Sequence, residues 1–146
     1  LNLKGETPVA TGELKPGADG RHTVQRPVEG RYFCLEASMP DGKDLAAIAE
    51  LYLTDENGKD ISRQKWSITY ADSESYQWSN NTADKIYDLQ ESTTWCTDYG
   101  TKFPHSIIID LKDNHKITGF RCLPSSEEGN PAAIKGFKGL CEKRTV

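Results

Sequence analysis

Short apolar segments dominate this sequence, and turn-forming residues separate them. The segments are rich in aromatic or β-branched residues and end at Gly, Pro, Asn or Asp, which is typical of strands. They are residues 8–14, 22–28, 31–37, 48–54, 66–70, 106–111, 117–123 and 134–143. Only residues 81–89 have the pattern of a short helix, with Thr82 as its cap and Ile86 facing inward. Many short strands and little helix predict an all-β fold, an antiparallel β-sandwich.

The length of 146 residues fits one domain with a core of its own. Residues 55–65 are polar and charged, so we expect this segment to cross the outside of the domain. No apolar run approaches the roughly 20 residues that a membrane-spanning helix needs.

The net charge is −4, and the sequence has no basic cluster. Nucleic acids and anionic membranes both favour a positively charged protein face, so this balance argues against both partners. It suits a neutral ligand better, such as a sugar or a polar peptide.

Motifs of enzyme active sites are missing. The sequence contains no GxSxG, no HExxH and no phosphate-binding Gly-rich loop, and its three histidines share no metal-binding spacing. A pair of Cys96 with a histidine is the remaining catalytic alternative, and a core thiol is the simpler interpretation. We therefore expect a protein that is not an enzyme.

The four cysteines form no CxxC pair, which argues against structural zinc. Two disulfides could form in three connectivities, and the sequence does not choose among them. Cys122 and Cys141 each lie in a strand-like run, where buried free thiols are the simpler interpretation.

Several segments together resemble discoidin domains, also called coagulation-factor C-type domains. Residues 83–95 (ADKIYDLQESTTW) are similar to the family signature A-x-x-A-x-D-G-D-x-x-T-x-W, and Trp95 aligns with its buried Trp. Residues 104–111 (PHSIIIDL) and 117–124 (ITGFRCLP) resemble P-H-x-I-x-I-D-L and I-x-G-F-R-Y-L-P. Segments 66–73 and 134–137 resemble the family strands that precede and follow these. The resemblance implies a galactose-binding-like sandwich, a group that includes family-32-type carbohydrate-binding modules.

The first part of the chain resembles the same family out of order. Segments 7–14, 30–37 and 47–51 are similar to strands that normally end the domain, but here they begin it. One explanation is a circular permutation in which residues 55–65 join the old termini. The other is a fragment cut across two tandem modules. The permutation supplies one copy of each strand, which is enough to close one sandwich, whereas a fragment of two modules would leave unpaired strand edges in both halves. It predicts one domain over residues 1–146, with segments 8–14 and 137–143 as adjacent strands.

The resemblance implies a non-catalytic carbohydrate-binding module. Such modules are accessory domains of secreted or surface glycoside hydrolases, so we expect covalent linkage to a larger multidomain protein. The expected location is extracellular, cell-surface or periplasmic, and the expected partner is a glycan or polysaccharide. The alternatives are a structural spacer, or a discoidin-like domain that binds proteins or phospholipids. Membrane-binding relatives expose apolar loop residues beside basic residues, whereas the loops here are polar and the net charge is −4, which disfavours the lipid-binding alternative.

Loops at one end of the sandwich are expected to bind the ligand, namely residues 73–80, 97–103 and 125–133. The proposed ligand-binding residues on them are Tyr76, Trp78, Tyr99, Glu127 and Asn130. Sugars stack on aromatic rings and bond to polar side chains, whereas edge packing or simple solvation is the alternative role for each residue. Relatives carry a His after the signature Trp and an Arg after L-P. This chain has Cys96 and Ser125 there, so galactose is not the expected ligand.

The resemblance also implies a structural calcium ion. The donors it implies are the Lys85, Gln90, Thr93 and Ala49 carbonyls, the Thr93 hydroxyl, and the Asp88 and Glu50 carboxylates. Leu89 stands where the family has Gly, so a left-handed backbone there would be strained. The alternative is that Asp88 caps the turn after the helix and Glu50 is an ordinary strand acid. The permuted alignment requires Glu50 to lie beside Asp88 and Thr93 with or without the ion.

Overall fold

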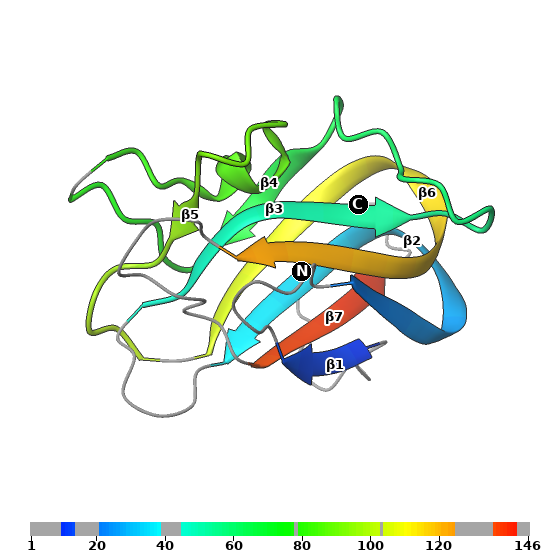
Figure 1. Cartoon of the computed structure of the whole chain (residues 1–146), viewed down its shortest axis with the longest axis horizontal. Coiled ribbons are helices and arrows are strands. Elements are labelled where there is room, and N and C mark those ends of the chain that lie inside the picture. Colours follow the sequence, from blue (N-terminus) through cyan, green and yellow to red (C-terminus); the bar gives the residue numbers. More distant parts are fainter. Residues whose placement is uncertain are drawn as a thin grey trace.

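β-Strands make up nearly all of the regular structure. The computed structural model describes residues 10–13, 21–38, 45–77, 79–102, 104–124 and 136–142. The strands are β1 (Ala10–Glu13), β2 (Arg21–Ser38), β3 (Ala47–Thr54), β4 (Ser67–Ala71), β5 (Trp95–Cys96), β6 (His105–Pro124) and β7 (Gly136–Glu142), and one 3-10 helix, η1, spans Ala83–Tyr87. All strand pairs are antiparallel, which confirms the all-β class (Figure 1). No helix among these residues has the length and apolarity to cross a membrane.

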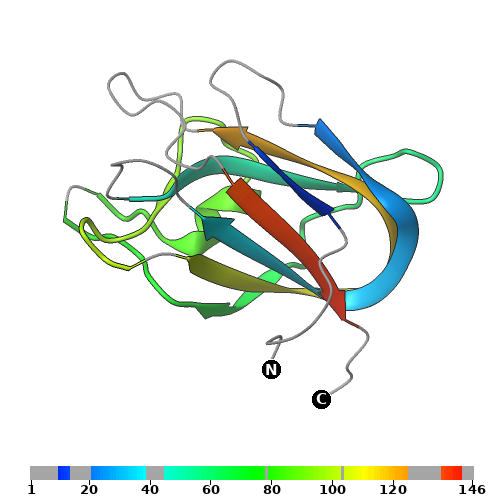
Figure 2. The same ribbon diagram turned by 90° about the horizontal axis from the view of Figure 1, so that it is seen from below.

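The strands form one sheet that folds back on itself. Its order is β1-β7-β2-β6-β3-β5, with β4 also paired to β6. The first half of β6 lies between β4 and the second half of β2, whereas its second half pairs with β3. Strands β2 and β6 therefore cross from one layer to the other, and Figure 2 shows the layers facing each other. Strands β1 and β7 pair in register from Ala10↔Gly139 to Glu13↔Gly136, as the permuted order predicted.

Two expected pairs of strands prove to be single long strands. Segments 22–28 and 31–37 merge into β2, and segments 106–111 and 117–123 merge into β6. The expectation of separate strands was wrong because β2 and β6 pair on both sides of their bends, from Arg21↔Arg121 to Ala37↔His105, and residues between the apolar runs, such as Glu29 and Gly30, remain in the ladder. Register shifts occur between Thr23 and Val28 and between Gly30 and Tyr32, and such irregularities bend strands. Lys112 takes a φ of 71° at the bend of β6.

A partly buried ion pair lies at this bend. Asp110 is 7% exposed and accepts hydrogen bonds from Arg31 Nε (2.9 Å) and Nη2 (3.1 Å), as well as from the Lys112 backbone N–H (2.8 Å). Arg31 lies in β2 and Asp110 in β6, so the pair joins the two long strands. The hydrogen bonds from Arg31 lower the pKa of Asp110 to about 2, and the backbone N–H of Lys112 adds to this effect.

This pKa predicts a specific loss of stability in acid. Because the folded-state pKa is depressed from 3.8 to about 2, the stabilisation is complete above pH 4 and disappears as the pH falls to 2. The contribution of Asp110 is on the order of 2 kcal/mol. Urea unfolding at pH 6 and at pH 2 measures this effect. Between these two pH values, the free energy of unfolding of Asp110→Asn should fall by about 2 kcal/mol less than that of the wild type. Parallel pH profiles for the two proteins would contradict the prediction.

The core lies between the two layers. Its side chains come from the second half of β2, from both halves of β6, from β3 and from the segment around η1, and Phe33 and Phe120 meet with ring centroids 6.0 Å apart. The largest fully buried side chains are Trp95, Phe33, Phe120, Leu35, Ile48, Leu51, Leu53, Ile86, Ile107, Ile109 and Leu111. Trp95 has no exposed surface, which confirms its expected place in the core.

The helix is shorter than expected, and its cap differs. Ile86 is fully buried, as predicted. Thr82 occupies the N-cap position but makes no side-chain hydrogen bond to the helix backbone, because its hydroxyl bonds to the Asp84 carboxylate instead.

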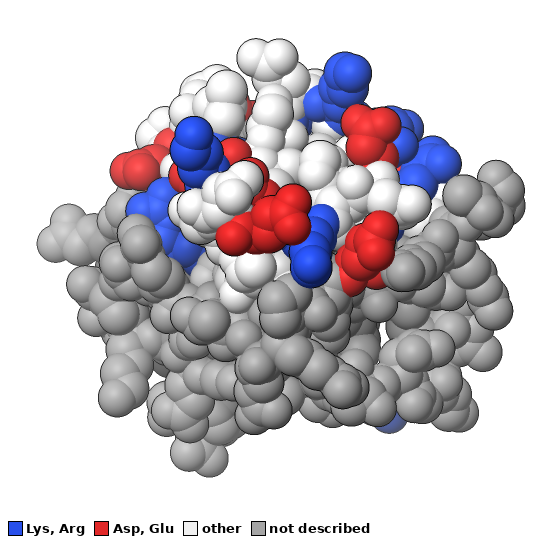
Figure 3. Space-filling model, turned by 90° about the vertical axis from the view of Figure 1, so that its right-hand side faces the viewer, with Lys and Arg blue, Asp and Glu red and all other residues white. Residues whose placement is uncertain are grey.

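Residues 55–65 were expected to cross the outside, and this is correct except for two side chains. Residues 56–60 are exposed, and basic and acidic side chains are interspersed on this end of the molecule (Figure 3). Ile61 and Arg63, however, are 6% and 8% exposed. The apolar Ile61 fills the core, and Arg63 has a buried partner that the sequence pattern did not reveal.

Cys34, Cys96 and Cys122 are buried free thiols, and for Cys96 and Cys122 this confirms the interpretation from the sequence. Burial raises the pKa of Cys34 and of Cys122 to about 12, so both thiols are protonated at neutral pH. The side chain of Cys141 lies outside the described part of the structure.

Candidate functional site

Two of the three expected ligand loops meet at one end of the sheet. Ser73 joins them, because its hydroxyl accepts a hydrogen bond from Asp98 N (2.8 Å) and its carbonyl accepts one from Trp95 Nε1 (3.0 Å). Ser75 N also donates to the Cys96 carbonyl (2.8 Å). Loops 73–80 and 97–103 are thus anchored to the buried Trp95 and form one surface.

Two tyrosines project from this surface, and we call them the tyrosine pair. Tyr76 is 62% exposed and Tyr99 is 70% exposed, so most of each residue is accessible to a ligand. The Tyr76 hydroxyl donates to Glu74 Oε2 (3.3 Å), while Glu74 Oε1 accepts from Ala83 N (2.9 Å). The charge of Glu74 raises the pKa of Tyr76, so the phenol stays protonated and remains a hydrogen-bond donor.

The remaining expected ligand residues are not described. Trp78, Glu127 and Asn130 lie outside the described residues, as do Phe103 and the rest of loop 125–133.

A histidine fixes the loop that carries Tyr99. His105 is 2% exposed; its Nδ1 lies 2.8 Å from Asp72 Oδ2 and its Nε2 lies 3.1 Å from Thr101 Oγ1. The order Asp–His–Thr has the form of a catalytic triad. The Thr101 hydroxyl, however, also bonds to the Asp98 carbonyl (2.8 Å), and the second Asp72 oxygen binds Ser106 N (2.9 Å). These contacts tie β4, β6 and the Tyr99 loop together, which is the role that the geometry supports.

A second polar cluster lies behind η1 and is centred on Glu50. A register shift between Ile48 and Glu50 interrupts the pairing of β3 with β6, and such irregularities redirect side chains. Glu50 has no exposed surface, although it is charged in its ordinary state. Burial raises the pKa of Glu50 to about 7, the nearby Asp88 carboxylate adds to the rise, and Arg63 opposes it. Glu50 is therefore not an ordinary strand acid.

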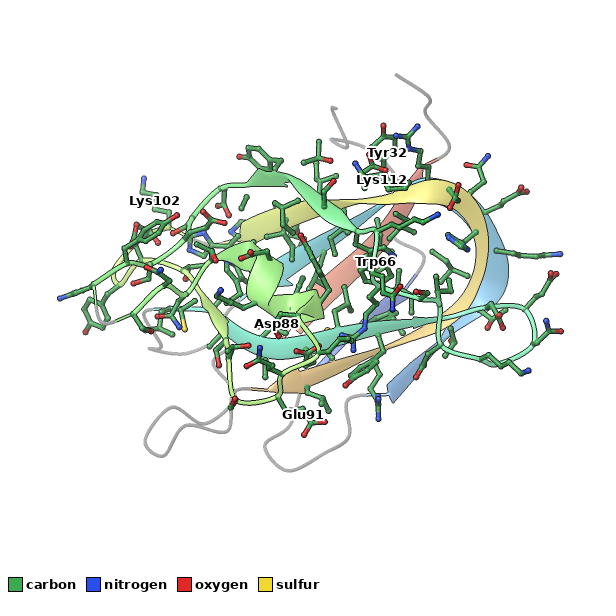
Figure 4. All side chains as sticks on the ribbon, turned by 90° about the horizontal axis from the view of Figure 1, so that it is seen from above. Tyr32, Trp66, Asp88, Glu91, Lys102 and Lys112 are labelled. Carbon is green, nitrogen blue, oxygen red and sulfur yellow. The ribbon has the colours of Figure 1, made fainter. Side chains whose placement is uncertain are left out.

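The turn after η1 brings three more of the expected metal ligands to Glu50. Gln90 N donates to Glu50 Oε1 (3.1 Å) and to Asp88 Oδ1 (3.0 Å). The Thr93 hydroxyl lies within hydrogen-bond distance of Asp88 Oδ2 and 3.0 Å from the Gln90 carbonyl. Glu50, Asp88 and Thr93 therefore adjoin, as the permuted alignment required. In Figure 4, Asp88 lies at the end of the helix beside β3, whereas Glu91 extends away from it.

The other two expected ligands lie on the elements that flank this cluster. Ala49 precedes Glu50 on β3, and Lys85 is part of η1. Leu89 has a φ of 67° and is 66% exposed. The left-handed conformation expected at this position is thus present in a residue whose side chain disfavours it.

Arg63 is the residue of this cluster that the sequence did not reveal. Its Nη1 donates to Glu50 Oε2, and lies 3.2 Å from the Leu51 carbonyl and 3.4 Å from the Ile86 carbonyl. Its Cζ lies 4.0 Å from the centre of the Tyr52 ring. The one sequence feature that could have indicated its burial is its place two residues after the apolar Ile61, in an otherwise polar segment.

The chemistry of this cluster suits a hard cation. The buried Glu50 carboxylate lies near the half-buried Asp88 carboxylate, and the one guanidinium pairs only with Glu50. A hydroxyl and a turn carbonyl adjoin them, and oxygen atoms of these kinds are the ligands that Ca²⁺ prefers. Among the described residues no three side chains of His, Cys, Asp or Glu converge, so a metal here would depend on backbone carbonyls and Thr93 as well.

Comparison with known proteins gives a partial match. No family model matches the chain. Two galactose oxidase sequences from Gibberella zeae are each 34% identical to it over 77 residues. The match covers 50% of this chain and 11% of each relative, so the chain spans about a tenth of the length of the curated relatives it matches. The relatives are named as enzymes, and the similarity concerns a small part of them.

Proposed function

We propose that this chain is a non-catalytic carbohydrate-binding module that binds its glycan through the tyrosine pair. The observation that carries the proposal is the exposure of Tyr76 and Tyr99 on two loops anchored to the same buried Trp95. Exposed aromatic rings on a rigid support offer stacking surfaces to the C–H faces of sugars. Glu74, Asp98 and Ser73 supply hydrogen-bonding groups near them.

The fold that goes with this proposal is the galactose-binding-like sandwich in permuted order, over residues 1–146. Three features support it: the folded-back sheet, the pairing of β1 with β7, and the contact of Glu50 with the turn after η1. The last two contacts join segments far apart in the sequence, and the permuted alignment required both.

The partial match suggests how such a module is used. The relatives carry the name of an oxidase that acts on a sugar, and this chain corresponds to about a tenth of each. We infer an accessory role in a larger protein of the glycoside hydrolase or related type, in an extracellular, cell-surface or periplasmic setting. The proposed partner is then a glycan, and nucleic acid and membranes are not expected partners.

Glycan binding tests the proposal directly. A glycan array should give reproducible hits for the wild type, and Tyr99→Ala should weaken the best hit by at least about tenfold in calorimetry, because it removes a stacking surface. Tyr76→Ala should act in the same direction. Tyr70→Ala is the matched control, since Tyr70 is 50% exposed but lies on β4 outside the loops.

The opposite results are equally clear. If the array shows no hit and the chain pulls down with phosphatidylserine vesicles, the discoidin-like lipid-binding alternative replaces the proposal. If neither ligand binds, the spacer alternative does. Equal affinity in Tyr99→Ala and wild type would remove the tyrosine pair as the site.

We also propose that the Glu50 cluster holds a structural calcium ion. Glu50, Asp88 and Thr93 would contribute side-chain oxygens, and Ala49, Lys85, Gln90 and Thr93 would contribute carbonyls. A bound divalent cation would offset the repulsion between the two carboxylates and support the left-handed backbone at Leu89.

Thermal unfolding checks the calcium proposal. Calcium at about a hundredfold excess over its Kd should stabilise the fold by about 2.7 kcal/mol and raise Tm by roughly 5–10 °C, and a chelator should reverse the change. Asp88→Asn should abolish the response, and Glu91→Gln, an exposed neighbour, should keep it. A wild-type Tm that does not respond to calcium would end the proposal.

A further inference from the structure

A small pocket lies at the end of the sheet opposite the tyrosine pair. Strand β3 starts at Ala47, which pairs with Cys96 beside the tyrosine loops, and runs to Thr54 at the far end, about 23 Å away at the usual rise per residue. Figure 1 shows this separation. The pocket has a volume of about 240 Å³ and is lined by Thr54, Gly58, Asp60, Phe120 and Arg121.

The rim of the pocket is held in place by Asp55. Its carboxylate accepts hydrogen bonds from the backbone N–H groups of Asn57 (2.8 Å) and Lys59 (3.0 Å). Its carbonyl accepts from Gly58 N (3.0 Å) and from the Thr118 hydroxyl (2.6 Å) on β6. Thr54 and Asp60 form a β-bridge across the loop. The rim is therefore already ordered, so binding a ligand would cost little conformational entropy.

Arg121 is oriented by stacking. Its Cζ lies 4.0 Å from the centre of the Tyr52 ring, and Arg63 also lies 4.0 Å from that ring centre. A stacked guanidinium keeps its plane fixed and leaves its N–H edge available to a carboxylate in bidentate geometry.

Two opposite charges thus face the same pocket. Among the described side chains, neither Arg121 nor Asp60 takes part in an ion pair. Basic and acidic groups are interspersed over this end (Figure 3). A ligand with an acidic group and hydrogen-bond donors would satisfy both residues at once.

We propose that this pocket binds a small hydroxylated carboxylate of the uronate class. Arg121 would hold the carboxylate, and Asp60 and Thr54 would form hydrogen bonds with the hydroxyls. The volume lies below the roughly 300–1,000 Å³ of pockets for drug-sized ligands, which fits a single ring. Asp60 would repel a simple anion, so the pair selects for a ligand that carries hydroxyls as well.

This site is separate from the proposed glycan site and does not depend on it. Titration of the ¹⁵N-labelled full chain with D-glucuronate should shift the amide signals of Gly58 and Asp60, with a Kd in roughly the millimolar range. D-glucose, which lacks the carboxylate, and acetate, which lacks the hydroxyls, should leave these signals unchanged. Tyr99→Ala should bind glucuronate like the wild type.

Variants assign the interaction to the two charged residues. Arg121→Gln and Asp60→Asn should each weaken glucuronate binding by at least about tenfold. Asp60→Asn is the cleaner variant, because Arg121→Gln also removes the stacking on Tyr52. Lys116→Gln is the control for a charge change at the same end, since Lys116 pairs with Glu56 (3.9 Å) outside the pocket.

Several outcomes would overturn the proposal. Unshifted Gly58 and Asp60 signals in glucuronate would show that the pocket binds no such ligand. Equal shifts of these amide signals with acetate would show that the pocket binds anions in general. Equal shifts with glucose would show that Arg121 does not bind the carboxylate of the ligand. Full binding by Asp60→Asn would place the ligand elsewhere.

Discussion

Replacing Trp95 with alanine is expected to destabilise the fold by about 3–5 kcal/mol, as for other buried aromatic side chains. The ring has no exposed surface and belongs to the core between the layers. The residue also sits in β5, opposite Ile48 of β3, and its Nε1 donates to the Ser73 carbonyl (3.0 Å). The substitution thus leaves a cavity and an unpaired buried carbonyl. Urea unfolding at neutral pH measures the change.

Two companion variants separate the contributions of Trp95. Trp95→Phe keeps most of the apolar surface but loses the hydrogen bond, so it should cost clearly less than the alanine variant. Tyr99→Ala, at an exposed aromatic, should change the free energy of unfolding by no more than about 0.5 kcal/mol. If Trp95→Ala lowered the free energy of unfolding no more than Tyr99→Ala does, the alignment of residues 83–95 with the discoidin signature would lose its strongest support.

The strands were predictable because their signals are local. Apolar alternation and flanking turn residues identified the segments that became β1, β3, β4 and β7, within a few residues at each end. The union of two segments into β2 and of two into β6 was not predictable in this way. It depends on pairing between residues about 80 positions apart, such as Arg31 with Asp110, and no local pattern reports that contact.

The Glu50 cluster, too, was predicted from the sequence only in part. The resemblance to a known family brought Glu50, Asp88 and Thr93 together correctly, and it anticipated the left-handed backbone at Leu89. It did not supply Arg63, because a charged residue in a polar segment is ordinarily solvated. Its burial follows from the partner, since a buried carboxylate needs a cation or a proton.

For the tyrosine loops, the sequence predicted the exposed residues but not the contacts that hold the loops in place. Sequence reasoning placed Tyr76 and Tyr99 on loops at one end, and both are exposed there. The contacts that hold those loops, through Glu74 and through His105 with Asp72, are side-chain interactions between residues 9 to 34 positions apart. Periodicity carries no information about them.

Removing the positive charge of Arg63 should be as costly as removing Trp95. Arg63→Met keeps most of the volume of the stem but leaves Glu50 buried beside Asp88 with no counter-cation. Breaking a buried ion pair in this way costs about 3–5 kcal/mol. Arg63 also donates to the carbonyls of Leu51 on β3 and Ile86 on η1, and the substitution would remove the donor from both carbonyls. Urea unfolding at pH 7 with a chelator present measures the loss without compensation by a metal.

The pH dependence and the double variant identify the cause of this loss. In Arg63→Met the pKa of Glu50 should rise further above 4.5, because the lowering effect of the guanidinium is gone. An acid with a raised folded-state pKa favours the protonated folded form, so stability should fall as the pH rises from about 4.5 through 7 and beyond. Arg63→Met with Glu50→Gln should recover much of the loss, since no buried charge is then left unpaired. A single variant with wild-type stability at pH 7 would contradict this prediction and show that the buried Glu50 does not need the positive charge of Arg63 there.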